Sequence, residues 1–188
     1  TARDGTAFLS SGTWSLIGTE LDAPVLTPRA MQLNFSNEGG VARTTRLLKN
    51  VMGLWLLQGC RRSWSESGSD FSYKDLTDAA ERAPGFRHLV DPDDQSFANP
   101  DDMPGALDAF CRRTNQPCPA TPGGYARAVS DSLALKYRLV IRDLEALTSR
   151  PIERIRVIGG GSQNGLLNQL TADATGLPVV AGPTEATA

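Results

Sequence analysis

The sequence predicts an α/β layered domain. Three observations support this fold class. Short apolar segments rich in β-branched and aromatic residues occur within Ala7–Leu21 and Met31–Asn37, a long helical periodicity follows Thr121, and strand, helix and strand patterns alternate between Arg154 and Pro183. Strands and helices in this mixture are typical of a sheet covered by helices.

The N-terminal part predicts a hairpin, a third strand and a helix. Two apolar runs flank "SSGT" within Ala7–Leu21, which is the pattern of a β-hairpin. The segment Met31–Asn37 predicts a third strand that ends at the turn residues Glu38–Gly40. From Thr44 to Arg62 we expect a helix, because apolar residues recur there at helical spacing: Leu47, Leu48, Val51, Leu54, Trp55 and Leu56.

The middle of the chain predicts a looped insertion followed by a long helix. Residues 63–119 are richer in Asp, Ser, Gly and Pro, with short helices expected at Leu76–Ala83 and Gly105–Arg113. Thr121 and Pro122 are typical of a helix start, and Pro151 of its end. The buried stripe of this helix is predicted to be Val129, Leu133, Val140, Leu144 and Leu147.

The C-terminal part predicts a strand–helix–strand unit. Ile155–Ile158 and Val179–Val180 have the apolar character of buried strands. Between them, Asn164–Thr175 predicts a helix that Gly176 ends.

Composition and charge exclude several classes of function. A formal net charge of −2, with Lys and Arg scattered along the chain, gives no electrostatic basis for nucleic-acid binding. No apolar run is long enough to cross a membrane, and the first residues lack a signal-peptide pattern. Cys60, Cys111 and Cys118 match no metal-binding spacing and indicate a reduced, cytoplasmic setting.

Three consecutive glycines follow the strand at Ile155–Ile158. They are not a dinucleotide fingerprint, because Asn164 occupies the position where that motif has its last glycine, and no P-loop Lys follows. Glycines still let a flat ring or a phosphate lie against bare backbone, and the helix that begins near Asn164 offers N–H groups to an anion. The alternative is a tight strand-to-helix turn with no ligand.

Two further stretches are candidate binding elements. "SSGTWS", Ser10–Ser15, places four hydroxyls and a glycine at a hairpin tip, which suits phosphate oxygens but is also common in ordinary turns. Asn50 and Gln58 are eight residues apart in the expected helix, so their amides would share one side of it. They would face either a cleft or solvent.

The acidic stretch "DPDDQSFANPDDMPG" is interpreted as solvated loop and helix caps. It lacks the alternating acids and the sixth-position glycine of a calcium loop. His88 has no neighbouring nucleophile or acid in the sequence, which favours a structural role.

In their order along the chain, several stretches resemble one known group of enzymes. "FLSSGTWSLIGTEL", "NFSNEGG", "LLKNVMGLWLLQ", "DSLALKYRLVI" and "VIGGGSQNGLLNQLTADATGLPVVAGPTEA" are similar to the second half of bacterial rhamnulokinases, which are sugar kinases of the FGGY carbohydrate kinase family. The resemblance implies an actin-like, ribonuclease H-like ATPase fold: three layers, with a mixed sheet and helices on both faces. Residues 1–188 would be one C-terminal lobe, truncated at both ends.

The resemblance also implies roles for individual residues. Gly12 and Thr13 would contact the terminal phosphates of ATP, and Gly160 and Gly161 would form the floor beneath the nucleotide. Ser162, Gln163 and Asn164 would lie near the adenosine. Gln58 would bind ATP and Asn50 the sugar, because both match positions that face the cleft.

The implied reaction is phosphoryl transfer from ATP with Mg²⁺ to L-rhamnulose. In the family, the catalytic carboxylate lies upstream of the hairpin tip in a His-Asp-Thr context. Asp4, in "TARDG", lacks that context and is not assigned the role. We therefore expect this chain alone to be inactive. The alternative is a non-enzymatic, actin-like nucleotide-binding module.

Overall fold

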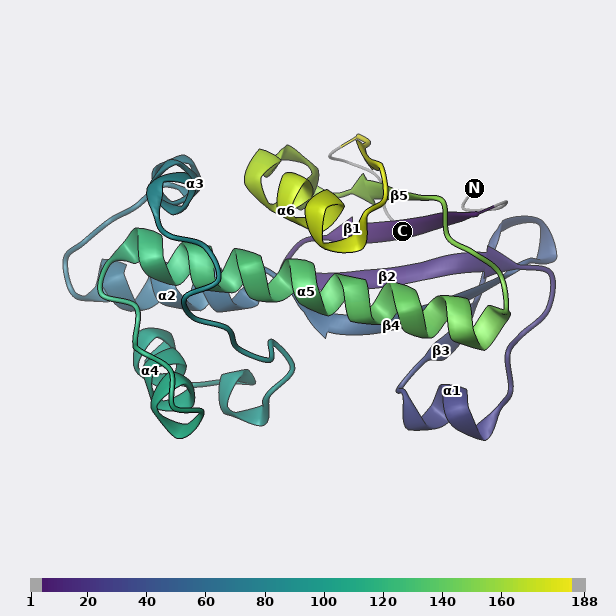
Figure 1. The fold of residues 1–188 in the computed structure, drawn as a ribbon, viewed down its shortest axis with the longest axis horizontal. Helices are drawn as coiled ribbons and strands as arrows, with labels where there is room; N and C mark the ends of the chain where they lie inside the picture. The colour runs from purple at the N-terminus through teal and green to yellow at the C-terminus, as the bar shows by residue number, and fades with distance from the viewer. Residues whose placement is uncertain (1–4, 184–188) are drawn as a thin grey trace.

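The computed structural model describes residues 5–183, which form a mixed sheet and the helices packed against it (Figure 1). The sheet has six strands in the order β3-β4-β2-β1-β5-β6. β1 pairs antiparallel with β2 and parallel with β5, β4 pairs antiparallel with β2 and β3, and β6 pairs parallel with β5. The strands are β1 (Thr6–Ser11), β2 (Trp14–Leu21), β3 (Ser36–Gly39), β4 (Thr45–Met52), β5 (Arg154–Ile158) and β6 (Val179–Ala181).

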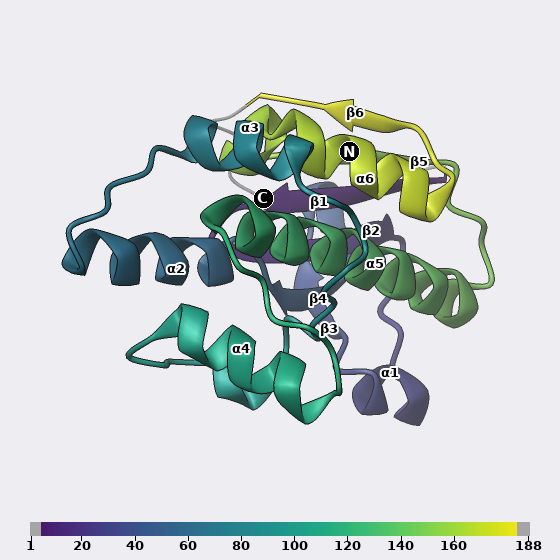
Figure 2. The same ribbon diagram turned by 60° about the vertical axis from the view of Figure 1, so that its left-hand side comes forward.

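Two helices cover the sheet, and three others lie beyond one end of it. The long helix α5 and the crossover helix α6 lie over the same face, whereas α2, α3 and α4 extend past the sheet around the first half of α5 (Figures 1 and 2). The helices are α1 (Pro28–Gln32), α2 (Trp55–Glu66), α3 (Tyr73–Arg82), α4 (Met103–Arg113), α5 (Pro122–Thr148) and α6 (Gly165–Thr175). The two helices expected within the insertion are confirmed as α3 and α4.

The long helix forms as its sequence predicts. Thr121 Oγ1 accepts a hydrogen bond from the backbone N–H of Gly124 at 3.1 Å, which caps the first turn. The helix ends at Ser149, whose φ of 53° is left-handed. Four residues of the predicted stripe are buried in the core and the last, Leu147, is partly buried against it: Val129, Leu133, Val140, Leu144 and Leu147.

The helix expected at Thr44–Arg62 is wrong over its first half. Thr45–Met52 is strand β4, and the helix starts only at Trp55. Leu47 and Leu48 are adjacent and both fully buried, because Leu47 lies in the main core and Leu48 packs beside Gly18 on the other face of the sheet. A strand buried on both faces loses its polar–apolar alternation, so its pattern resembles that of a helix.

The segment Met31–Asn37 is likewise only partly a strand. Thr27 caps the short helix α1 by accepting a hydrogen bond from Ala30 N at 3.1 Å, and Pro28 begins it. Strand β3 starts only at Ser36.

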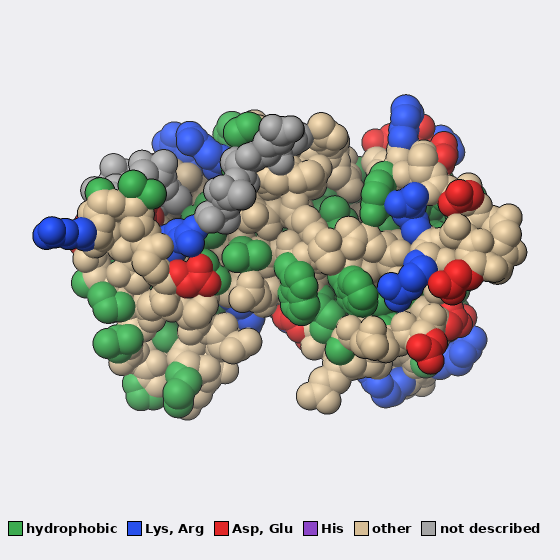
Figure 3. Space-filling model, turned by 180° about the vertical axis from the view of Figure 1, so that it is seen from behind, with side chains coloured by type: hydrophobic (Ala, Val, Ile, Leu, Met, Phe, Trp, Pro, Cys, Tyr) green, Lys and Arg blue, Asp and Glu red, His purple; other side chains and the backbone are tan. Residues whose placement is uncertain are grey.

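The two faces of the sheet differ in what covers them. Ala7 and Leu9 of β1 are buried beneath the helices, whereas Phe8 and Ser10 between them are partly exposed. Figure 3 views the molecule from this second side, where hydrophobic side chains lie among polar ones. Within residues 5–183, the expectation of helices on both faces is therefore met on one face alone.

Candidate functional site

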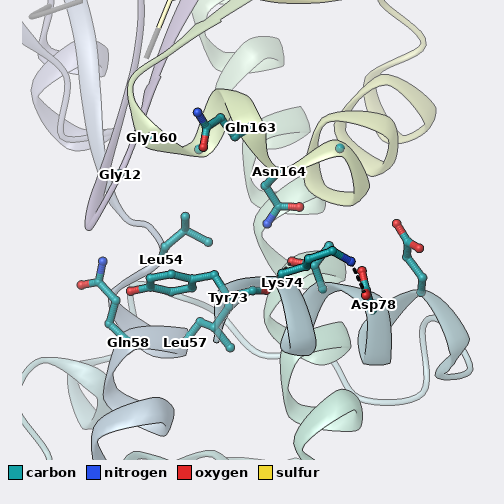
Figure 4. A pocket seen from close by; sticks show the side chains of 14 residues that line it. Gly12, Leu54, Leu57, Gln58, Tyr73, Lys74, Asp78, Gly160, Gln163 and Asn164 are labelled. Carbon is teal, nitrogen blue, oxygen red and sulfur yellow. Dashed lines mark hydrogen bonds and ion pairs between the residues drawn. The ribbon is translucent and has the colours of Figure 1, made fainter. Parts of the chain in front are cut away.

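A hollow of about 630 Å³ opens where the hairpin tip, the glycine turn and two helices meet (Figure 4). Gly12 lines it from the tip between β1 and β2. Leu54, Leu57 and Gln58 line it from the start of α2. Gly160, Gly161, Gln163, Asn164 and Gly165 line it from the turn before α6, and Tyr73, Lys74, Thr77, Asp78 and Glu81 from α3.

The three glycines of the turn have different structural roles. Gly159 has a φ of 83°, which favours glycine, and a Cβ there would lie 2.9 Å from Ser11 O. A Cβ on Gly161 would overlap Ser11 Oγ and lie 2.6 Å from Ser11 Cβ. A Cβ on Gly160 would meet no atom within 4 Å. Two glycines therefore allow the chain to turn against β1, and the third leaves open space beside the hollow.

The hairpin tip is joined to the start of α2 by backbone hydrogen bonds. Gly12 O accepts from Leu54 N at 2.9 Å, and Thr13 O accepts from Gly53 N at 3.1 Å and from Trp55 N at 3.0 Å. These bonds fix the backbone of Gly12 at the edge of the hollow. The side chain of Thr13 is exposed and does not line it.

The start of α6 forms another side of the hollow. Asn164 Oδ1 accepts from Leu167 N at 3.0 Å, the usual bond of a helix N-cap. Ser162 is buried and does not line the hollow, and its carbonyl accepts from Asn168 Nδ2 at 2.9 Å. The N-terminal end of a helix carries partial positive charge, so this side suits an anionic group.

The structure brings together five of the residues proposed from the sequence: Gly12, Gln58, Gly160, Gly161 and Asn164. Gln163, named with them, also lines the hollow. Asn50 does not. It lies on β4 opposite Leu16, exposed, so the shared helix face assumed for Asn50 and Gln58 is wrong. Asp4 lies outside the described residues.

Sequence reasoning missed the contribution of α3. Leu76 and Ala80 bury one side of this helix, and its polar residues then face the hollow. Lys74 Nζ forms an ion pair with Asp78 Oδ2 at 2.6 Å, and this hydrogen bond raises the pKa of Lys74. The start of this helix can be predicted from the sequence, since Ser72 and Asp75 form a capping box. The position of α3 opposite the glycine turn depends on tertiary packing.

The acidic stretch serves as loop and caps, as predicted. Asp94 Oδ1 accepts from Ser96 N at 3.0 Å, and Lys136 forms ion pairs with Asp91 and Asp93 at 2.7 and 2.9 Å. Within residues 5–183, no three His, Cys, Asp or Glu side chains are grouped as a metal site requires.

His88 also has the structural role expected of it. Its Nδ1 is hydrogen-bonded to Pro117 O at 2.7 Å, and this bond joins two loops of the insertion.

Comparison with known proteins identifies the family. The family model described as the C-terminal domain of the FGGY family of carbohydrate kinases matches residues 7–188. The chain belongs to this FGGY family. Rhamnulokinase from Bacteroides thetaiotaomicron is 56% identical over 97% of this chain and 37% of its own length. Rhamnulokinase from Bacillus subtilis is 42% identical over 99% of this chain and 38% of its own length.

The fold agrees with that of solved FGGY kinases. A xyloylose kinase from Brucella ovis superposes with a TM-score of 0.67 at 16% identity, covering 100% of this chain and 37% of that one. The predicted actin-like fold with its mixed sheet is thereby confirmed. This chain spans a little over a third of the length of the two rhamnulokinases. No helix in the described part is long and apolar enough to span a membrane.

Proposed function

We propose that this chain is the C-terminal, nucleotide-binding lobe of an ATP-dependent sugar kinase, and that the sugar is L-rhamnulose. The observation that carries the proposal is the shared hollow. Gly12 at the hairpin tip and the turn at Gly160 and Gly161 are 148 residues apart along the chain, from 12 to 160, yet they line one space. Its volume is within the range of small-molecule sites, about 300–1,000 Å³.

The arrangement suits a ligand that is flat at one end and anionic at the other. Gly160 offers backbone with open space above it, where an adenosine could lie without meeting a side chain. The tip at Gly12 and Thr13 would receive the terminal phosphates, and the start of α6 adds partial positive charge. Gln58 and Asn164 complete the proposed ATP set, and Mg²⁺ would accompany the phosphates. The role proposed for Ser162 has no support in the hollow, because Ser162 is buried and does not line it.

Phosphoryl transfer requires mainly that the donor and acceptor be positioned and that charge be stabilised. This chain would hold the donor. Two carboxylates line the hollow within residues 5–183, Asp78 and Glu81. Both lie on α3, and Asp78 is paired with Lys74. We therefore place the carboxylate that removes the hydroxyl proton in the part of the relatives that this chain does not match. The sugar identity rests on the similarity to rhamnulokinases. The role proposed for Asn50 at the sugar has no support in the hollow.

The test is thermal unfolding with and without MgADP. Ligand at about 100 times its dissociation constant adds about 2.7 kcal/mol of stability, and so raises the midpoint by roughly 5–10 °C. The matched control is Gly160→Asp, whose Cβ would meet no atom within 4 Å and whose negative charge should repel the nucleotide and abolish the rise. No rise in the unaltered chain would contradict nucleotide binding.

A non-enzymatic nucleotide-binding module is the second candidate. One observation favours it: among the described residues, the acids that line the hollow lie on α3, and none lies on the hairpin tip. A chimera in which this chain replaces the matching part of the Bacteroides thetaiotaomicron rhamnulokinase separates the two. Phosphorylation of L-rhamnulose by the chimera supports a kinase lobe, and a folded chimera that binds MgADP without turnover supports the module.

A further inference from the structure

A buried tyrosine lies beneath the site. Tyr137, on α5, is fully buried, and its hydroxyl lies 2.7 Å from Ser15 Oγ. Ser15 is also fully buried and is separated from the hairpin tip by Trp14 alone. A buried hydroxyl without a hydrogen-bond partner destabilises the fold, because it loses its hydration and gains no bond in return. The bond therefore fixes the start of β2 to α5.

Ser15 belongs to the pair of residues that closes the hairpin. In the register of β1 and β2, Ser11 lies opposite Ser15, with only Gly12, Thr13 and Trp14 between them in sequence. Directly paired residues of a sheet project to the same face, so both serines point towards α5. Ser11 is 1% exposed, and its hydroxyl has no hydrogen bond among the described residues.

Two of the other segments that line the hollow, the start of α2 and the glycine turn, pack against these serines. A Cβ on Gly53, just before α2, would lie 2.5 Å from Ser15 Oγ and 2.8 Å from Gly12 O. A Cβ on Gly161 would overlap Ser11 Oγ. The glycine turn thus packs against Ser11 and the start of α2 against Ser15, and Ser15 is the serine that is hydrogen-bonded to α5.

We propose that Tyr137 is a positioning residue for the site: its hydroxyl, through Ser15, holds the hairpin tip, the start of α2 and the glycine turn at the spacing that a nucleotide requires. The inference deepens the proposed function and rests on it for the identity of the ligand. Tyr137 does not line the hollow, so it acts on the ligand only through the backbone it holds.

The protonation state of Tyr137 agrees with this role. Burial raises the pKa of Tyr137 to about 12, against the opposing effect of its hydrogen bond with Ser15. The hydroxyl thus keeps its proton at neutral pH, where it can donate to Ser15 or accept from it.

The first test needs no ligand. Hydrogen exchange is measured for Tyr137→Phe and, as a matched control, for Tyr125→Phe, which removes another tyrosine hydroxyl of α5, bonded to Asp108 Oδ1 at 2.7 Å. We expect amide exchange in residues 10–13, 53–54 and 159–163 to rise about three- to tenfold in Tyr137→Phe alone, the factor that one hydrogen bond of ordinary net strength corresponds to. Exchange unchanged there, or raised equally in both variants, would overturn the inference.

The second test joins the inference to the function. Calorimetric titration with MgADP should give a dissociation constant three- to tenfold higher for Tyr137→Phe than for Tyr125→Phe or the unaltered chain. Equal constants would overturn the positioning role. If the unaltered chain does not bind MgADP, the proposed function fails while the exchange result still decides what Tyr137 does. Should Tyr137→Phe not fold, Ser15→Ala removes the same bond from the other side and must give the same exchange pattern.

Discussion

Alanine at Gly161 should lower the stability of the fold, whereas alanine at the neighbouring Gly160 should weaken ligand binding instead. At Gly161 the new methyl would lie 2.6 Å from Ser11 Cβ and 3.0 Å from Ser11 O. Rotation of the serine side chain cannot relieve these contacts, because both atoms are fixed to strand β1. Either the strand or the turn must move. At Gly160 the methyl would have nothing within 4 Å.

The magnitude follows from the cost of overpacking. An extra methyl in a well-packed site typically costs about 1–3 kcal/mol. For 188 residues, an unfolding entropy of about 2.1 cal/mol/K per residue gives roughly 0.4 kcal/mol/K, so Gly161→Ala should lower the midpoint by about 3–8 °C. Gly160→Ala should change it by less than about 1 °C and instead weaken MgADP binding, because its methyl enters the hollow.

Differential scanning calorimetry of both variants, with and without MgADP, measures the two effects together. A loss of stability in Gly160→Ala as large as in Gly161→Ala would refute the assignment of separate roles to the glycines. Full stability in Gly161→Ala would show that the turn does not pack against Ser11 as closely as described.

Three other predictions concern two buried groups of α5 and two cysteines. Asp131→Asn should lower the free energy of unfolding in urea by about 3 kcal/mol, because it leaves the guanidinium of Arg127, bonded at 2.9 Å, without its buried anion; a loss under about 1 kcal/mol would contradict this. Since the raised pKa of Tyr137 favours its neutral form in the folded state, its contribution is complete below about pH 10 and is lost between pH 10 and 12; Tyr137→Phe should flatten the fall of stability with pH in that window, and an unchanged slope would count against it. Iodoacetamide followed by mass spectrometry should label the partly exposed Cys118 well before the buried Cys60, whose thiol pKa is raised by burial, and the reverse order would be inconsistent with the core.

Elements specified by local signals could be predicted from the sequence. The long helix has a Thr-Pro start and one continuous apolar stripe, and α6 has Asn164 at one end and Gly176 at the other. The helix α1 could have been found in the same way, since Thr27 and Pro28 repeat the Thr-Pro start of α5. Local bonds specify these elements, so the information lies within each segment.

Strand β4 could not be predicted in this way. Its partner β2 is about 30 residues away, and the burial of both Leu47 and Leu48 depends on what packs on each face of the sheet. The same apolar pattern puts Asn50 on the expected helix, whereas the strand runs to Met52 and the helix begins at Trp55. The contribution of α3 to the hollow also depends on tertiary packing. Its capping box predicts a helix, but no local signal predicts which segment that helix faces.

The measurement that tests the account most directly is an amide NMR titration of this chain with MgADP. Glycine amides are informative here, because Gly12, Gly160, Gly161 and Gly165 line the hollow from two elements far apart in sequence. The account predicts saturable shifts at all four residues with one common dissociation constant, and none at Gly39, which lies on β3. Shifts absent from both elements, or confined to one of them, would contradict a nucleotide site formed between the hairpin tip and the glycine turn.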